Sequence, residues 1–591
     1  MNKPGVAFGD YITRGDYKKR NWDYEGNKYS SRNFFLPIIC AVLFLILFAR
    51  LFFLQVIQGY YYRYLSNNNR TKTVTIHAPR GIIFDRNGIP LVFNSPGVRE
   101  NINGKTILLT QEEALKAIAQ GKTNLEVDSM RNYPYKDAAA HVLGYIGQIS
   151  KDELADPLFA GYSAADFIGK SGIEQEYESL LKGIDGKQLF EVDANGSLVR
   201  ILGQDDPTAG KNITLTLDVK LQEAAFAAMK DVKKGAAIVS TPKGEVLALI
   251  SKPSFDPNLF TMEQDYKISS SSAYLTLSDV LSDSDNQPLL NRAIAGVYPP
   301  GSTFKLIVAS AGLADKVIDE NWQIDDTGVL TVGSFSFSNW YYTGYGGTDG
   351  MVNVVKGIKR SNDIFFYKLA EKVGVDKVSQ MAKQFGLGEP LGIDLQGESA
   401  GTVPTQNWKL KNIGEQWYLG DTYHYGIGQG YLLTTPLQVN GWTQAIANGG
   451  TLYKPHLLKD QPPVALSKNL LDVHSSDLIK EGMVEACSPG GVAWPLFNYT
   501  VKNAKLPIDG KNILGVDPAS GSADMRHVVV ACKTGTAENG GNDTLAHAWI
   551  TLFAPAYNPQ IVVTVLSENS GEGSNVAGPI AKKILDNWFG R

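Results

Sequence analysis

The sequence is poor in cysteine and histidine. Its three cysteines, at positions 40, 487 and 532 of 591 residues, are too few and too scattered to predict a disulfide framework. Its seven histidines form no His-x-x-x-His arrangement, and there is no Cys-x-x-Cys pair. Because zinc sites are built from such patterns, we expect no metal site.

The chain also lacks a strong charge of either sign. A formal net charge of -4 over 591 residues provides no basic surplus for a polyanion, so nucleic acid is not an expected partner. The balance of 43% hydrophobic and 20% charged residues argues against disorder and against a protein with many membrane helices. The length predicts about two to four domains.

Long hydrophobic runs are absent except near the N-terminus. Residues 33–49 carry no charge and would span about 26 Å as a helix, and Arg50 and four further apolar residues continue the run. We therefore predict one transmembrane helix over residues 33–58. A cleaved signal peptide is the alternative, but no small-residue cleavage site follows. A buried core helix is the other alternative, but it would show a polar stripe.

The segment before this helix is basic. Residues 1–32 hold seven Lys and Arg against four Asp and Glu. Excess Lys and Arg marks the cytoplasmic side, so we expect a cytoplasmic tail, a single-pass anchor in the plasma membrane, and an extracytoplasmic remainder without access to ATP.

The rest of the chain predicts an α+β protein in two parts. Residues 60–217 indicate a β-rich stem, with a hairpin turned by Asn87-Gly88 and helices near 111–120 and 173–182. Residues 218–591 begin with a helix and a hairpin over 236–250. They end with strands near 528–531, 548–553 and 561–566 and a terminal helix. This pattern predicts an antiparallel sheet, flanked by helices and built from both ends of the domain, with a helical lobe inserted. Residues 262–290 are expected to form a surface loop.

Ser302 and Lys305 form the first candidate catalytic pair. Three residues apart on a helix, a hydroxyl and an amine share one face, and a helix start also offers free N–H groups for an oxyanion. A lysine whose pKa is lowered by burial can take the hydroxyl proton. Ser179 and Ser240 also stand three residues before a lysine, but one lies late in a charged helix and the other ends a strand.

Two further motifs carry hydroxyls and a second amine. Lys533, Thr534, Gly535 and Thr536 follow a β-branched run, where the lysine can hold a carboxylate and the glycine admits a substrate backbone. An exposed strand end with an incidental lysine is the alternative. Ser361-Asn362-Asp363 supplies a hydroxyl that could relay a proton, and a polar helix cap is its alternative.

In this order the motifs resemble those of the penicillin-binding proteins and their serine β-lactamase relatives. Residues 298–305, 426–430 and 547–555, with Pro79 to Gly88 in the stem, are similar to class B transpeptidases. Residues 169–174 and 568–581 are most similar to the elongation-type group, penicillin-binding protein 2. About 20 residues separate Gly59 from Arg80, too few for a glycosyltransferase domain, so a monofunctional enzyme is expected.

The resemblance implies a peptidoglycan D,D-transpeptidase. Ser302 would attack the bond between the terminal D-alanines of a stem peptide, with Lys305 as base. Ser361, Asp363 and Lys533 would complete the catalytic set. Thr534, Gly535 and Thr536 would bind substrate, and the N–H groups of Ser302 and Thr536 would form the oxyanion hole. β-Lactams would acylate Ser302. A multipass glycan polymerase would be the partner, and no cofactor is expected.

The sequence departs from the family pattern at the second motif. It has Asp363 where many relatives have Asn, which replaces hydrogen-bond donors by acceptors. Some relatives bind zinc ahead of this motif, but residues 306–360 contain no His or Cys, so none is expected. Two alternatives remain open from the residues: a D,D-carboxypeptidase or β-lactamase type of hydrolase, and a non-catalytic β-lactam receptor or scaffold.

Overall fold

The computed structural model describes residues 35–102, 105–120, 122, 125–193, 198–261, 272–515, 522–538 and 545–591. The tail predicted over residues 1–32 lies outside this part of the chain. The protein divides into two compact units, Met1–Val74 with Gln188–Gln204, and Thr75–Lys187 with Asp205–Arg591.

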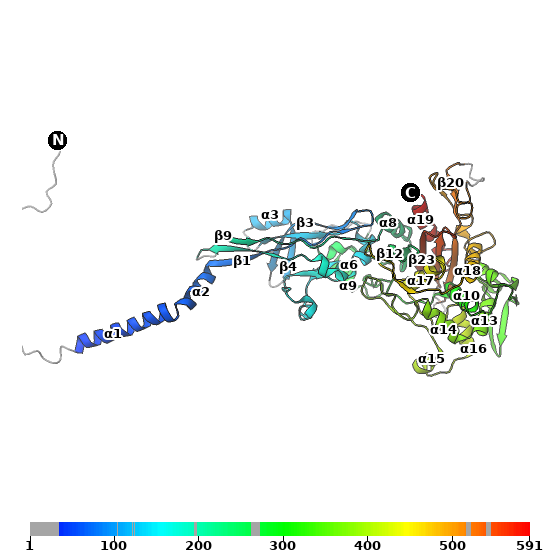
Figure 1. The fold of residues 1–591 in the computed structure, drawn as a ribbon, viewed down its shortest axis with the longest axis horizontal. Coiled ribbons are helices and arrows are strands. Elements are labelled where there is room, and N and C mark those ends of the chain that lie inside the picture. Colours follow the sequence, from blue (N-terminus) through cyan, green and yellow to red (C-terminus); the bar gives the residue numbers. More distant parts are fainter. Residues whose placement is uncertain are drawn as a thin grey trace, which may run out of the picture. The chain divides into compact units, whose positions relative to one another are not determined.

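The first unit contains the predicted transmembrane helix. α1 (Phe35–Phe52) runs without a break into the π-helical turn η2 (Phe53–Ile57), and the combined 23-residue helix is long and apolar enough to cross a membrane (Figure 1). Its apolar side chains are exposed, as expected of a surface that faces lipid. α2 (Gly59–Arg70) leads into a three-stranded sheet in the order β1-β8-β9, formed by β1 (Thr71–Ile76), β8 (Gly186–Val192) and β9 (Leu198–Asp205).

The second unit begins with the rest of the β-rich stem. β2 (Ile83–Phe84) and β3 (Pro90–Ile102) form the predicted hairpin, and Gly88 has a φ of +82° in its turn. The predicted helix over 173–182 is two short helices, because Tyr177 leaves helical geometry between them. The remaining stem elements are β4 (Lys105–Thr110), α3 (Gln111–Ala119), β5 (Leu125–Asn132), α4 (Ala140–Leu143), β6 (Ile146–Gln148), α5 (Lys151–Leu154), β7 (Phe167–Gly169), α6 (Gly172–Glu176), α7 (Glu178–Leu181) and β10 (Ile213–Thr214).

A buried ion-pair network lies within the stem. The carboxylate of Glu174, with none of its surface exposed, accepts hydrogen bonds from Arg80 Nε at 2.6 Å and from Arg131 Nε at 2.7 Å. Glu178 accepts a further bond from Arg80 at 2.6 Å. Arg80 and Glu174, which lie in the two stem segments that carry the family resemblance, therefore compensate each other's charge away from water.

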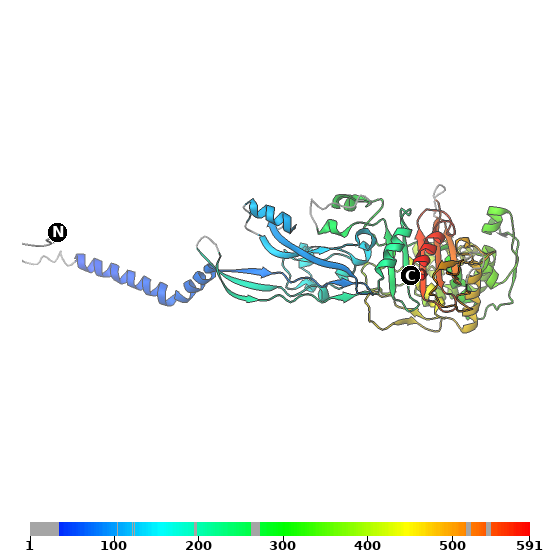
Figure 2. The ribbon, with the colours of Figure 1, turned by 90° about the horizontal axis from the view of Figure 1, so that it is seen from above.

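The catalytic part is built on one antiparallel sheet in the order β12-β11-β23-β22-β21. Its strands are β11 (Gly235–Ser240), β12 (Val246–Lys252), β21 (Ala531–Ala537), β22 (His547–Ala554) and β23 (Ile561–Ser567). α8 (Val219–Ala228) and the terminal α19 (Ala577–Phe589) cover one face (Figure 2). α17 (Pro436–Ala447) contacts the other face. The first and last segments of the domain thus share one sheet, as predicted.

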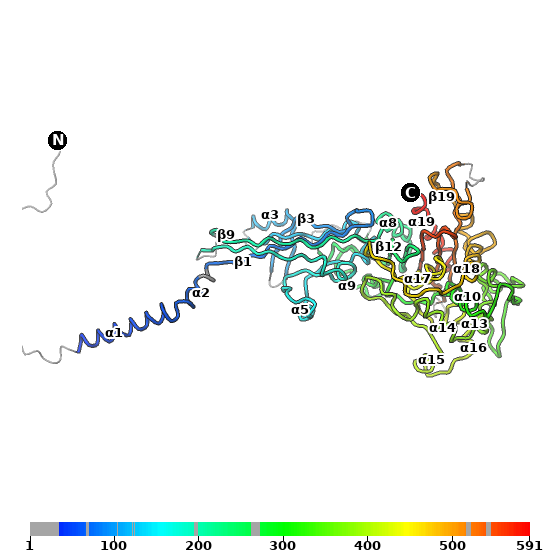
Figure 3. Tube along the Cα trace, in the orientation of Figure 1, coloured from blue at the N-terminus to red at the C-terminus, as the bar shows by residue number. Residues whose placement is uncertain are grey.

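The predicted helical lobe lies between β12 and β21 in the chain, and the trace leaves the sheet in green and returns in orange (Figure 3). Its helices are α9 (Leu277–Ser282), α10 (Lys305–Ala314), α11 (Trp340–Tyr345), α12 (Val354–Arg360), α13 (Asp363–Val373), α14 (Val375–Gln384), α15 (Gln406–Ile413), α16 (Leu419–Gly426), α17 and α18 (Val473–Ala486). Its short strands are β13 (Ile324–Asp326), β14 (Val329–Val332), β15 (Phe335–Ser338), β16 (Gly350–Val352), β17 (Leu452–Tyr453), β18 (Ala465–Ser467), β19 (Thr500–Lys502) and β20 (Met525–His527).

Two local predictions were wrong. The strand expected over 528–531 starts only at Ala531, because the N–H of Val528 bonds to Tyr499 and that of Val529 to Asn512, outside the main sheet. The loop expected over 262–290 contains α9, which Thr276 caps. Residues 262–271 of that loop lie outside the described part.

Candidate active site

Ser302 lies at the start of a helix, as its motif predicts. It belongs to the 3-10 turn η6 (Gly301–Phe304), which continues directly into α10. Ser302 is half-buried, whereas Lys305 has none of its surface exposed. The turn is held from behind, because the N–H of Gly301 bonds to the carbonyl of Gly428 at 2.9 Å.

Glycines let η6 lie directly against strand β21. A Cβ on Gly301, whose φ is +54°, would sit 2.8 Å from the carbonyl oxygen of Thr536. A Cβ on Gly535 would sit 3.0 Å from the carbonyl oxygen of Pro300. The close approach therefore requires glycine on both sides, and it brings the first and third motifs together.

The buried amine of Lys305 contacts the second motif. Its Nζ donates to Asp363 Oδ1 at 2.6 Å and to the carbonyl of Ser361 at 2.8 Å, and it lies 3.3 Å from Ser361 Oγ. The ring of Phe366 lies 5.5 Å away. The amine of Lys305, in the first motif, thus contacts Ser361, in the second motif, although the two residues lie 56 positions apart in the sequence.

Lys533 reaches the same hydroxyl from the sheet. Its Nζ donates to Ser361 Oγ at 2.8 Å and to the carbonyl of Thr534 at 2.8 Å. Ser361 Oγ therefore lies between two lysine nitrogens, one from α10 and one from β21. A hydroxyl in this position can receive a proton from one side and pass it to the other.

Burial opposes the charged form of both lysines. Complete burial lowers the pKa of Lys305 from the ordinary lysine value, although the charge of Asp363 partly opposes this shift. Burial lowers the pKa of Lys533 well below that value, and the neighbouring charge of Lys305 lowers it further. A lysine with a lowered pKa can act as a general base near neutral pH.

The second motif both caps a helix and contacts a candidate catalytic lysine. Asn362 caps α13 by accepting from the N–H of Phe365, as the alternative proposed. Ser361 and Asp363, on either side of it, contact Lys305. Ser361 has a φ of +52°, an uncommon conformation for a residue other than glycine. Ser361 caps the C-terminal end of α12 in this conformation, and the N–H of Asn362 bonds back to the carbonyl of Gly357 at 3.0 Å.

The three candidate substrate-binding residues lie on an edge strand. β21 pairs with β22 on one side and with no other strand of the described sheet. Thr534 is 8% exposed and Thr536 is exposed. The unpaired edge beside Lys533 is suited to an extended peptide, as the sequence predicted.

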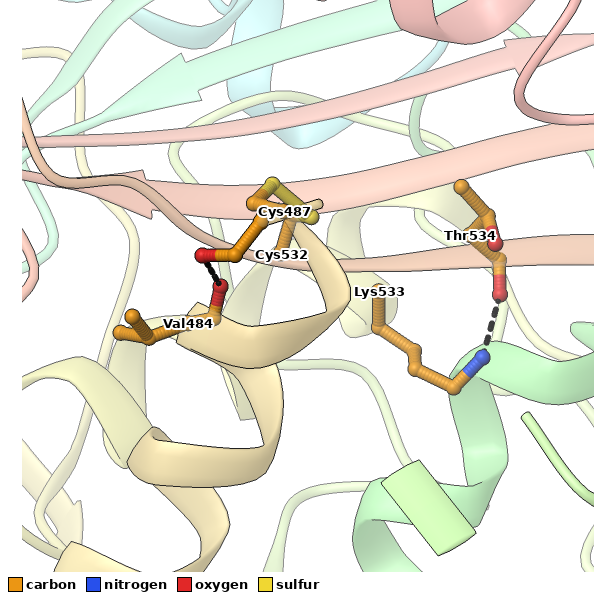
Figure 4. Close-up of a disulfide and its surroundings, with 6 residues drawn as sticks. Val484, Cys487, Cys532, Lys533 and Thr534 are labelled. Carbon is orange, nitrogen blue, oxygen red and sulfur yellow. Dashed lines mark hydrogen bonds between the residues drawn. A yellow bond between two sulfur atoms is a disulfide. The ribbon is translucent and has the colours of Figure 1, made fainter. Parts of the chain in front are cut away.

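A disulfide beside the third motif escaped the sequence analysis. Cys487, which directly follows α18, is bonded to Cys532, the residue before Lys533 (Figure 4). The two lie 45 residues apart and share no spacing motif, so only the fold reveals them as partners. Cys40 is free.

Three polar residues beside the second motif were also missed: Asp326, Asn339 and Asp349. They bond to the motif and to one another, but they stand alone in the sequence without a recognisable pattern. Within the described residues, no group of three or more His, Cys, Asp or Glu side chains could hold a metal ion.

A serine at a helix start, with two buried lysines meeting at a second serine, is the arrangement of a serine acyltransferase. A family model of the penicillin binding protein transpeptidase domain matches residues 235–586, and one of the penicillin-binding protein dimerisation domain matches residues 120–215. The chain belongs to the penicillin-binding protein transpeptidase family.

Relatives with the same organisation span nearly the whole chain. The peptidoglycan D,D-transpeptidase MrdA of Haemophilus influenzae is 34% identical over 95% of this chain and 93% of that protein. The complex of penicillin-binding protein 2 with MreC from Helicobacter pylori matches with a TM-score of 0.70 at 29% identity, covering 88% of this chain and 98% of that one. A peptidoglycan synthase complex that coordinates polymerization and crosslinking matches with a TM-score of 0.69 at 27% identity, covering 95% and 98%. The resemblance to penicillin-binding protein 2 is confirmed.

Proposed function

We propose that this chain is a peptidoglycan D,D-transpeptidase of cell-wall elongation in which Ser302 is the nucleophile. Its membership of the transpeptidase family supports the reaction class. One observation supports the roles of the individual residues. Ser361 Oγ lies 3.3 Å from Lys305 Nζ and 2.8 Å from Lys533 Nζ.

The first half of the reaction forms an acyl-enzyme. Neutral Lys305 takes the proton of Ser302 as the hydroxyl oxygen attacks the carbonyl between the two terminal D-alanines. The N–H groups of Ser302 and Thr536 stabilise the oxyanion. When the peptide bond breaks, the leaving D-alanine amine receives a proton through Ser361, and an ester on Ser302 remains.

Lys533 and its neighbours hold the donor peptide. A bound donor carboxylate would favour the ammonium form of Lys533, which with the Thr534 and Thr536 hydroxyls would hold that carboxylate while the peptide pairs with the edge of β21. In the second half, the amine of another stem peptide attacks the ester and loses its proton to the base. The ester bond to Ser302 breaks, and the Ser302 oxygen takes a proton back from the base. A cross-link results.

A fluorescent penicillin tests the nucleophile. We expect the wild-type chain to be labelled covalently, Ser302→Ala to remain unlabelled, and Ser179→Ala, a serine that also stands three residues before a lysine, to be labelled like the wild type. Labelling of Ser302→Ala would refute the assignment, and absence of wild-type labelling would favour a non-catalytic scaffold.

Product analysis separates the transpeptidase from a hydrolase. With a lipid-linked pentapeptide polymer as substrate, mass spectrometry should detect cross-linked dimers together with free D-alanine. Free D-alanine without dimers would instead indicate a carboxypeptidase.

The proposed organisation follows from the anchor. We assign residues 1–32 to the cytoplasm, 33–58 to the plasma membrane, 60–217 to the stem and 218–591 to the catalytic domain. A membrane-spanning α1 would place the enzyme beside lipid-linked glycan. Similarity to a synthase complex that couples polymerization and crosslinking supports a multipass glycan polymerase as partner.

A further inference from the structure

Two aspartates outside the predicted motifs surround the second motif. Asp326 ends β13 and Asp349 precedes β16, and the antiparallel pairing of these strands sets Asp326 opposite Gly350. The pairing therefore brings both carboxylates to the same end of a small ribbon. Asp326 is 2% exposed, and the side chain of Asp349 is 6% exposed.

Both carboxylates bind the amide of Asn362, the middle residue of the motif. Asn362 Nδ2 donates to Asp326 Oδ2 at 2.8 Å and to Asp349 Oδ2 at 3.0 Å. The other carboxylate oxygen of Asp349 accepts from Arg360 Nε at 2.9 Å. Arg360 and Asn362, the residues immediately before and after Ser361, are thus both bonded to Asp349.

A second branch reaches Asp363 through Asn339. Asn339, fully buried, donates to Asp326 Oδ2 at 2.9 Å and accepts from the N–H of Asp363 at 3.2 Å. The next residue, Trp340, donates its N–H to Asp363 Oδ2 at 2.9 Å. This leaves Asp363 Oδ1 directed at Lys305.

We propose that Asp326 and Asp349, acting through Asn339, Asn362 and Arg360, are positioning residues that hold Ser361 and Asp363 against the two catalytic lysines. The inference rests on the proposed function of those lysines. The residues form a hydrogen-bonded clasp, defined as Asp326, Asn339, Asp349, Arg360 and Asn362. The clasp touches no reacting atom and acts only through the geometry of the second motif.

The test measures acylation of the full-length chain by a fluorescent penicillin across a range of pH. In Asp326→Ala, the carboxylate oxygen that accepts from both Asn339 and Asn362 is lost, so the clasp opens. We expect the first-order acylation rate constant to fall by about 10- to 100-fold, as for a small misplacement of catalytic groups, with little change in the affinity before acylation. Asn339→Ala should change the same quantities in the same direction.

The pH profile distinguishes positioning from general stability. The charged groups facing Lys305 and Lys533 are each other and Asp363, and Asp363 raises the pKa of both lysines. If Asp363 moves away, the acid limb of the acylation rate should shift to lower pH. Lowered stability alone would not move this limb.

Asp394→Asn is the matched control. Asp394 accepts three hydrogen bonds, from Leu457, Leu458 and Tyr177, and contacts no residue of the clasp. The Asp394→Asn variant should have a lower melting temperature, while its acylation rate and the pH profile of that rate should be unchanged. A wild-type acylation rate and pH profile in Asn339→Ala, and in Asp326→Ala if it folds, would overturn the proposal. If wild-type labelling persisted in Ser302→Ala, the proposed nucleophile would fail instead.

Discussion

Lys305 and Lys533 are both fully buried, and both reach the hydroxyl of Ser361. Two ammonium groups so close together would repel each other, and the carboxylate of Asp363 would offset that repulsion only in part. At the residue scale, the reaction therefore depends on how protons are distributed between the two lysines. Their apparent pKa values describe the pair rather than either lysine alone.

Asp363→Asn should move the pH dependence of acylation. The carboxylate raises the pKa of both lysines, so its removal lowers those pKa values and makes a neutral base available at lower pH. We expect the acid limb of the rate of penicillin acylation to shift down by about one pH unit. A limb that stays in place, or moves upward, would contradict this role of Asp363.

At the scale of elements, the site depends on the contact between η6 and β21. Gly301 has a positive φ, and its Cα lies so close to Thr536 that a methyl group would meet the carbonyl oxygen at 2.8 Å. The two elements carry the nucleophile and the proposed oxyanion donor. A small separation would therefore weaken transition-state stabilisation.

Gly301→Ala should lower the acylation rate by about 10- to 100-fold. Gly333→Ala is its control, because Gly333 has a similar φ of +61° but an added Cβ would meet nothing within 4 Å. Both variants carry the backbone cost of alanine at positive φ, so only the close approach distinguishes them. Equal acylation rates in the two variants would show that the contact does not matter.

The disulfide is a second link between elements, since it joins the end of α18 to the strand that carries Lys533. Replacing Cys487 and Cys532 together by serine should reduce stability by about 2–4 kcal/mol, because the open chain gains conformational entropy. Thermal unfolding of the oxidised protein measures this loss. Cys40→Ser, which removes the free cysteine, should leave the melting temperature unchanged.

At the scale of the whole molecule, the anchor decides on which side of the membrane the chemistry occurs. Val127 in the stem is 83% exposed, so a cysteine there is open to solvent. In spheroplasts, a membrane-impermeant maleimide should label Val127→Cys but not Ser30→Cys, which should react only after lysis. The reverse pattern would show that the basic tail is exported.

Much of the architecture was predictable from local patterns. The Asn-Gly hairpin, the apolar helix and the sheet strands at both ends of the catalytic domain follow from turn chemistry and hydrophobic periodicity. The strand at Val528 could not be placed, because its backbone partners, Tyr499 and Asn512, lie in other segments. Hydrogen bonds between distant segments cannot be predicted from a few consecutive residues.

The sequence by itself determined which residue types were available for catalysis: a serine and a lysine one helical turn apart, and a lysine before a glycine on a strand. Only the tertiary structure decided that both amines meet at Ser361, that Asp326 and Asp349 hold its neighbours, and that Cys487 pairs with Cys532. The physical reason is that patterns record neighbours along the chain. Burial, pKa and hydrogen bonding depend on neighbours in space.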